Sequence, residues 1–386
     1  MLTQRPAAFE ITDEQRDIAK LAAEFATGEI APHIMQWDRD HTFPRPLFTK
    51  MNALGLMGLL IPEEYDGVGA GYVAYALAVE ELAKVDAGTA VTLSVHSMIC
   101  AAVQKLGNEA QKKKYLPKLA SGDSIAGFAL TEPDAGSDAA HIRSTAKRTG
   151  DSYVLNGRKQ WCTNGSYAGV TMGMFRTGGE GPKGISAFLI DADTPGVVVE
   201  KVTEKLGIHT SNTCDVAFSD AKIPHDALLG SEGEGLSGAL TTLTAGRIGI
   251  AAQACGILGA CLEASVKFAR EREAFGKPIG AFEGISFKIA QMATDLDAAQ
   301  LLTYRAAALC DAGKPFATEA SKAKFFASTA ARKHAAEALQ IHGGYGYTTE
   351  FPVERYYRDA KITEIYEGTS EIQQLIIARS LLGRLE

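Results

Sequence analysis

The sequence predicts an α+β protein built from three domains. These are an N-terminal helical domain over residues 1–122, a middle β-domain over 123–230 that forms a barrel or sandwich, and a C-terminal four-helix bundle over 231–386. Two observations predict this arrangement. The period of apolar residues changes from helical to alternating and back to helical. The length of 386 residues also exceeds what one hydrophobic core usually supports.

Composition excludes several classes of protein. A hydrophobic share of 46% and a charged share of 22% are typical of globular proteins. The net charge of −7, with no basic run beyond residues 112–114, argues against a nucleic-acid partner. Residues 1–10 lack a signal-sequence pattern, and no uninterrupted apolar run reaches a membrane-spanning length. We therefore expect a cytoplasmic protein without a membrane partner.

The cysteine pattern predicts free thiols. No C-x-x-C pair occurs, and the contexts are apolar or alternating, so we expect buried thiols in a reducing compartment and neither disulfides nor a metal site. The six residues are Cys100, Cys162, Cys214, Cys255, Cys261 and Cys310.

The N-terminal domain is expected to begin with a helix capped by Thr12. Ile18, Leu21 and Phe25 follow at helical spacing, and Pro32 ends or kinks the pattern. Further helices are expected over residues 48–60, 72–85, 87–106 and 109–119, with a loop over 62–71.

The middle domain carries a hairpin signal at Asn156-Gly157. Residues 153–155 are expected to enter this turn as one strand and residues 158–162 to leave it as the next. Further short strands are expected over residues 170–175, 185–190, 196–202 and 214–218.

The C-terminal domain returns to helical spacing in longer units. Gly246, Gly249, Gly256 and Gly259 lie along the first of these helices and allow other helices to approach closely. Three long helices and a shorter closing one predict an antiparallel bundle. The helices are expected over residues 236–270, 282–310, 318–339 and 353–366, followed by a terminal helix.

The terminal helix directly follows a carboxylate. Ser370 and Gln373 fit a capping box, and Glu371 places negative charge in the first turn. Glu367 then lies on a short bent connection beside Gly368, where a ligand can approach the backbone closely. A base held this way suits proton abstraction next to a carbonyl, although a lone glutamate here is also typical of a solvated acid.

Four other segments combine polar groups with glycine or aromatic residues. Residues 128–138 can bind a polar ring and phosphate oxygens, or form an ordinary tight turn. Residues 161–163 can form a platform for a ring or pack in the core. Arg272 can hold a diphosphate in a bidentate way, and the loop at 340–346 permits close backbone approach, although surface arginines and C-cap glycines are common. We expect His342 to be a packed side chain and not a base.

The order of these segments is more specific than any one of them. Together, across essentially the whole chain, they resemble the acyl-CoA dehydrogenase family, whose length and helical–β–helical order also match. The motifs are F-A-L-T-E-P-D-A-G-S-D (128–138), W-C-T-N-G (161–165), R-E-A-F-G-K-P (272–278), Q-I-H-G-G-Y-G (340–346), R-D-A-K-I (358–362) and I-Y-E-G-T-S-E-I-Q (365–373).

The resemblance implies an FAD enzyme that oxidises a fatty acyl-CoA to the trans-2-enoyl-CoA. Glu367 matches the base that removes the α-proton, and flavin N5 accepts the β-hydride. Burial raises the pKa of such a base, and the family binds the thioester oxygen through the backbone N–H of the base and a flavin hydroxyl. The resemblance also implies a homotetramer and an electron-transfer flavoprotein as electron acceptor.

Site residues follow by position in the family motifs. Those matching flavin contacts within the chain are Phe128, Ala129, Leu130, Thr131, Gly136, Ser137, Trp161, Cys162, Thr163, Thr369 and Glu371. Those matching contacts to FAD from a neighbouring subunit are Arg272, Phe275, Gln340, Ile341, Gly343 and Gly344, and Phe282 matches a further FAD contact. Those matching acyl-CoA contacts are Ser137, Thr244, Arg247 and Gly368.

Two positions depart from the family pattern. Phe128 often appears as Tyr, and Glu283 stands where Gln is common, so a contact of Glu283 to FAD is not carried over. Residues 243–254 and the loop at 340–346 look most like short-chain, butyryl-type members. The alternatives are a flavin-dependent oxidase or monooxygenase, which typically lacks the glutamate, and a non-catalytic flavin-binding relative.

One further expectation concerns Gly246. In relatives acting on isovaleryl and long-chain substrates, the base matches this position, just before Arg247. Both positions must reach the same α-carbon, so we expect Gly246 to lie beside Glu367.

Overall fold

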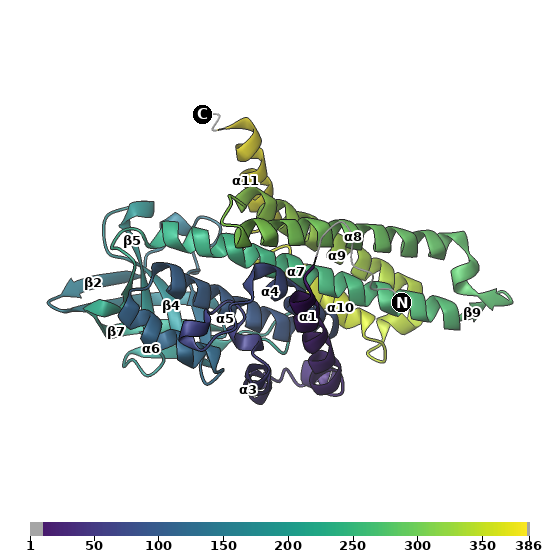
Figure 1. Cartoon of the computed structure of the whole chain (residues 1–386), viewed down its shortest axis with the longest axis horizontal. Helices are drawn as coiled ribbons and strands as arrows, with labels where there is room; N and C mark the ends of the chain where they lie inside the picture. Colours follow the sequence, from purple (N-terminus) through teal and green to yellow (C-terminus); the bar gives the residue numbers. More distant parts are fainter. Residues whose placement is uncertain (1–10, 384–386) are drawn as a thin grey trace.

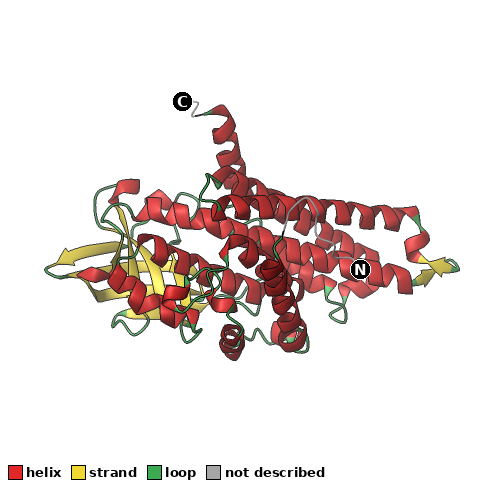
Figure 2. Ribbon diagram, in the orientation of Figure 1, coloured by secondary structure: helices red, strands yellow, loops and turns green. Residues whose placement is uncertain are grey.

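The structure is a computed structural model that describes residues 11–383. Residues 1–10, where no signal pattern was found, lie outside the described part. Shorter N-terminal helices lie beside a β-sheet at one end of the molecule, and long C-terminal helices extend to the other end (Figures 1 and 2). The predicted α+β fold is confirmed, with a β-sheet part that follows the N-terminal helices and precedes the C-terminal helices in the chain.

The N-terminal part is helical, and Thr12 caps its first helix in a capping box with Gln15. A π-helical turn, Ala26–Ile30, follows this helix. The helix expected over 48–60 stops early, because Gly55 adopts a φ of 73° and a 3₁₀ turn follows. The helices are α1 (Asp13–Phe25), α2 (Ile34–Arg39), α3 (Arg45–Ala53), α4 (Gly71–Val85), α5 (Ala87–Leu106) and α6 (Glu109–Ala120).

The middle part is one mixed sheet with the strand order β6-β7-β3-β1-β4-β5-β8, in which β2 pairs with β3 and β4. Most pairs are antiparallel, but β1 and β4 run parallel. A separate apolar core includes Tyr153, Phe175, Phe188 and Phe218. The strands are β1 (Ile125–Ala129), β2 (Thr145–Thr149), β3 (Ser152–Thr163), β4 (Ala168–Arg176), β5 (Ile185–Asp191), β6 (Val197–Val202), β7 (Thr213–Pro224) and β8 (Leu228–Leu229).

The hairpin predicted at Asn156-Gly157 is wrong. Strand β3 continues through both residues, and the chain reverses earlier, where Thr149 pairs with Ser152. Gly157 has a φ of 140° and marks an irregularity in the pairing with β7. A side chain there would collide with Ser144, so the glycine permits a close approach within the sheet and not a turn.

The C-terminal helices form the long axis of the molecule, and α7 runs from the sheet to the far end (Figure 1). Helix α10 ends four residues earlier than expected, since residues 363–369 form the turn that carries Glu367. The elements are α7 (Gly235–Glu271), β9 (Glu273–Ala274), β10 (Lys277–Pro278), α8 (Glu283–Asp311), α9 (Ala317–His342), α10 (Val353–Ile362) and α11 (Ser370–Leu382).

Helices α5 and α7 are long and apolar enough to cross a membrane, but 89% of each apolar stretch is buried inside the described structure. Burial of this kind is what core helices require. All six cysteines are free thiols; Cys310 is partly exposed and the others are buried. The glycines of α7 allow the predicted close packing, because a Cβ at Gly249 would collide with Tyr75 and Ser94.

Candidate functional site

Glu367 lies on a left-handed turn between α10 and α11. Its φ is 56°, which is unusual for a residue with a side chain, and Gly368 follows with a φ of 92°. Thr369, and not Ser370 as predicted, is the N-cap of α11 and accepts a hydrogen bond from Ile372 N–H at 3.4 Å. Ser370 is instead the first residue of α11, and its own backbone N–H donates to Glu364 O at 2.9 Å.

The helix before the turn is anchored to the other two parts of the molecule. Arg358 of α10 pairs with Asp38 of α2 at 2.6 Å. The Asp359 carboxylate accepts the backbone N–H of Ile208, from the segment between β6 and β7, at 2.5 Å. The start of the Glu367 turn is therefore fixed by all three parts.

The carboxylate of Glu367 forms no side-chain hydrogen bond within residues 11–383. The residue as a whole is half-buried, but its Oε2 atom is shielded from solvent and unpaired among the described residues. Burial raises the pKa of Glu367 to about 7, and the nearby charges of Arg247 and Lys324 oppose that rise. A carboxylate with this pKa can act as a base at neutral pH.

The carboxylate of Glu367 lies against a glycine of helix α7, where no side chain occupies the space. A Cβ on Gly246 would lie 2.5 Å from Glu367 Oε2 and 2.9 Å from Met98 Sδ. The expectation that Gly246 lies beside Glu367 is confirmed. Arg247, the next residue, is buried, and its Nη1 donates to Ser321 Oγ at 3.4 Å.

Other residues around the turn had no sequence signal. Tyr366 O–H donates to Gln253, whose amide in turn donates to Ala87 O at 2.7 Å. Tyr75 O–H donates to Ser94 Oγ at 3.0 Å. Tyr75, Ser94 and Gln253 lie inside apolar helices, where polar side chains look like ordinary core residues until their partners are known.

Two of the segments predicted to contact the flavin meet at the sheet. Phe128 of β1 pairs with Thr163 of β3. Trp161 is 57% exposed, with a φ of 55°, so its ring is available to a ligand. Cys162, by contrast, is buried in the sheet core and can offer a ligand only its backbone.

The loop after β1 is held rigidly on β3. The ammonium group of Lys159 donates to Leu130 O at 3.2 Å and to Glu132 at 2.7 Å. Gln160 N–H donates to Thr131 O at 2.7 Å. Farther along the loop, a Cβ on Gly136 would meet nothing within 4 Å, and Ser137 is exposed, so this stretch is open to a ligand. An exposed aromatic ring beside a fixed loop with open backbone fits a flavin and its phosphates.

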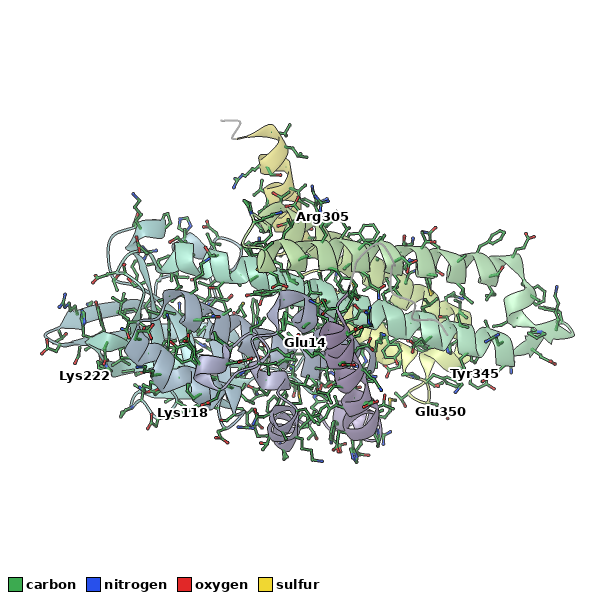
Figure 3. The ribbon with its side chains drawn as sticks, in the orientation of Figure 1. Glu14, Lys118, Lys222, Arg305, Tyr345 and Glu350 are labelled. Carbon is green, nitrogen blue, oxygen red and sulfur yellow. The ribbon has the colours of Figure 1, made fainter. Side chains whose placement is uncertain are left out.

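The residues predicted to contact the FAD of a neighbouring subunit lie at the opposite end of the molecule from the sheet, around the ends of α7 and α9. A cavity of about 490 Å³ there is lined by residues including Arg272, Ile341, Gly343 and Gly344. Tyr345 and Glu350, labelled in Figure 3, also line it, far from Lys222 on the sheet. The sheet and this distal cluster therefore lie far apart in a single chain.

This distal cluster has an exposed aromatic edge. Phe275 is 94% exposed and lies edge-on to Phe282 at 6.0 Å between ring centres. Gln340 and Glu283 are exposed. His342 is buried, bonds Ala338 O at 2.8 Å and stacks on Phe268, and burial lowers its pKa, so its predicted packing role is confirmed.

The other predicted ligand contacts lie close to Glu367 in the chain or on α7. Thr369 is half-buried and Glu371 is exposed at the start of α11. Thr244 lies on α7, three residues before Arg247, and its hydroxyl donates to Leu240 O at 2.7 Å. Gly368 directly follows Glu367.

Comparison with known proteins covers nearly the whole chain. Family models for the acyl-CoA dehydrogenase N-terminal, middle and C-terminal domains match residues 12–123, 127–221 and 233–382. An acyl-CoA dehydrogenase of Bacillus subtilis is 48% identical over 97% of this chain and 99% of its own length. The butyryl-CoA dehydrogenase of Megasphaera elsdenii is 43% identical, with a TM-score of 0.95 over 97% of this chain and 99% of that chain. A chain from the structure of the electron transferring flavoprotein of Acidaminococcus fermentans is 45% identical, with a TM-score of 0.96 over 97% of this chain and 100% of that chain.

Proposed function

This chain belongs to the acyl-CoA dehydrogenase family, and we propose that Glu367 is the base with which it removes the α-proton of a short-chain acyl-CoA. The protein is an FAD-dependent oxidoreductase that dehydrogenates acyl-CoA thioesters. The single observation that carries the assignment of the base is the shielded, unpaired Oε2 of Glu367 next to Gly246.

The reaction requires the α-proton to move to a carboxylate while the thioester oxygen is stabilised. Oε2 of Glu367 receives the proton, and because burial raises the pKa of Glu367 to about 7, the carboxylate binds that proton more strongly than a solvated one would. The backbone N–H of Glu367 donates to the thioester oxygen, which makes the α-proton more acidic. FAD, when bound, would supply the acceptor for the hydride that leaves the β-carbon.

The two clusters would contact FAD in different ways. The flavin ring would be held by Leu130, Thr131, Trp161 and Thr163. At the start of α11, FAD would also contact Thr369 and Glu371. The distal cluster around Arg272 and Gly343 contacts the FAD of a neighbouring subunit, in a homotetramer. The separation of the two clusters along the chain's long axis supports this assignment.

Several features follow from the relatives. Butyryl-CoA is the substrate named for the Megasphaera elsdenii relative, which supports a short straight acyl group here. The Acidaminococcus fermentans structure supports an electron-transferring flavoprotein as electron acceptor. We place the domain limits at 1–122, 123–230 and 231–386, and the enzyme in the cytoplasm.

An anaerobic titration with a panel of acyl-CoAs tests the substrate. The FAD-loaded enzyme is mixed with butyryl-, hexanoyl-, octanoyl- and isovaleryl-CoA, and bleaching of the flavin band is followed. We expect butyryl-CoA to give the fastest bleaching. Faster bleaching by octanoyl- or isovaleryl-CoA would refute the short-chain assignment, and rapid reoxidation of the reduced enzyme by oxygen would favour an oxidase.

A further inference from the structure

Lys324 of α9 lies behind the Glu367 turn and is completely buried. Its ammonium group donates to the backbone carbonyl of Gly368 at 2.7 Å. Gln373 of α11 donates to the same carbonyl at 2.8 Å and to Glu367 O at 3.3 Å. The two left-handed residues of the turn are therefore held from α9 and from α11 together.

A buried ammonium group is costly unless its charge has a partner. Burial lowers the pKa of Lys324 to about 8, whereas the negative charge of Glu367 raises it. The carbonyl of Gly368 could be satisfied by a neutral donor, as it already is by Gln373. A lysine at this position is explained by the carboxylate that its charge faces.

The charges around the pair come from several elements. Arg247 of α7 faces both Glu367 and Lys324, and Glu364 and Glu371 act on Lys324 from the turn and from α11. Tyr75 of α4 and Tyr366 are neutral hydroxyls whose pKa values Glu367 raises further. Two buried cations, Arg247 and Lys324, thus act on Glu367, and Lys324 also bonds the turn itself.

From this geometry we infer that Lys324 is a positioning residue for the base. Its hydrogen bond to Gly368 fixes the left-handed turn, and its charge keeps the carboxylate of Glu367 ionised so that it can accept the α-proton. This inference rests on the proposed role of Glu367. Sequence motifs gave no indication of it, because Lys324 lies 43 positions before Glu367 in the middle of an ordinary helix.

The test compares variants of the FAD-loaded enzyme. Lys324→Met removes the charge and the donor at similar volume, Lys324→Arg keeps both, and Lys322→Met removes a partly exposed lysine from the same helix as a control. The first-order rate of anaerobic flavin reduction by butyryl-CoA is measured across pH. We expect the pH midpoint to rise by about 1 unit or more in Lys324→Met, as loss of a nearby opposite charge requires, and to stay near that of the parent enzyme in the other two.

An unchanged midpoint in Lys324→Met, even with a lower rate at every pH, would overturn the inference. If that variant does not retain FAD, Lys324→Gln replaces it, since an amide can donate but carries no charge, and the same rise is expected. Infrared titration of the protonated carboxyl band that disappears in Glu367→Gln provides a readout independent of turnover. If Glu367→Gln stays reactive, the proposed function fails, while the infrared shift still tests the effect of Lys324.

Discussion

The reactivity of Glu367 depends on its surroundings. An ordinary glutamate has a pKa of 4.5, but burial raises that of Glu367 to about 7 even though Arg247 and Lys324 oppose the rise. The largest effect is therefore desolvation of the carboxylate. The same burial that makes the group a stronger base also leaves a large share of it protonated below neutral pH.

This balance predicts the pH dependence of the reaction. The protonated acid cannot accept the α-proton, so we expect the rate of anaerobic flavin reduction to be low at pH 5 and to rise with pH through a midpoint near 7. Stopped-flow measurements of flavin reduction by butyryl-CoA between pH 5 and 9 determine this midpoint. A midpoint near 4.5 would mean that the carboxylate is solvated in the reacting enzyme.

At the scale of single residues, the sequence predicts those features that depend only on neighbouring residues in the chain. Glu367 and the bend at Gly368 are predictable because glycine, a cap and an apolar helix follow one another in the chain. The cap itself falls one residue earlier than predicted, on Thr369, and Ser370 is the first residue of α11. Lys324 and Gln253 are not predictable, since their partners lie far away in sequence.

At the scale of elements, α7 is shaped by close contacts with α4. A Cβ on Gly256 would lie 2.6 Å from Ala83 Cβ and would also collide with the backbone carbonyl of Glu80. Gly259, one turn later, has its nearest neighbour at 3.4 Å, the flexible end of Lys84. Within one helix, Gly259 can therefore accept a side chain, whereas Gly256 cannot.

We expect Gly256→Ala to lower the free energy of unfolding by roughly 1–3 kcal/mol, because backbone atoms cannot move aside. Gly259→Ala is expected to leave stability unchanged or raise it by up to about 1 kcal/mol through helix propensity. Denaturant unfolding of both FAD-loaded variants, in parallel with the parent, measures the difference. Equal effects would show that α7 does not pack against α4 as described.

The convergence of α7 with the turn predicts that the base can be moved. In Glu367→Gly combined with Gly246→Glu, the Cβ of the new glutamate no longer meets the old carboxylate, and Met98 Sδ, 2.9 Å from that Cβ, must shift. We expect this double variant to recover part of the activity that Glu367→Gly loses, with a changed preference among butyryl-, hexanoyl- and octanoyl-CoA. A folded, flavin-loaded double variant as inactive as the single one would contradict the convergence.

Element types were largely predictable from periodicity, but the hairpin was not. The expected helices over 87–106 and 109–119 appear as α5 and α6. Asn156-Gly157 failed because the glycine serves a close contact with Ser144 in the middle of a long strand. Dipeptide signals describe local conformation, whereas strand continuity is set by neighbouring strands.

At the scale of the whole molecule, the site we propose is incomplete in one chain. The sheet that carries one cluster and the distal cluster lie toward opposite ends of the long axis (Figures 1 and 3). Sequence motifs identify the residues of both clusters, but only the structure shows their separation. A second copy that brings its distal cluster to the sheet of the first would complete the site.

Arg272 tests this arrangement. It lies at the exposed end of α7, over the Tyr345 ring at 5.5 Å. We expect Arg272→Ala to lose FAD more readily on dilution and to weaken subunit association, since a cation opposite a diphosphate is removed. Flavin content by absorbance and mass by light scattering measure both effects. Arg270→Ala, which removes the arginine two residues earlier, is the control. Unchanged flavin content and mass in Arg272→Ala would refute the assignment.

The most direct test of the central claim is anaerobic flavin reduction by butyryl-CoA in Glu367→Gln. The amide keeps the size of the side chain but cannot accept the α-proton. The control is Glu364→Gln, three residues earlier, whose carboxylate pairs with Arg332 at 2.9 Å and Lys361 at 2.7 Å. We predict that Glu367→Gln retains FAD and binds butyryl-CoA but reduces the flavin more slowly by roughly three orders of magnitude or more, whereas Glu364→Gln keeps most of the rate. Near-normal bleaching in Glu367→Gln would place the base elsewhere and contradict the account.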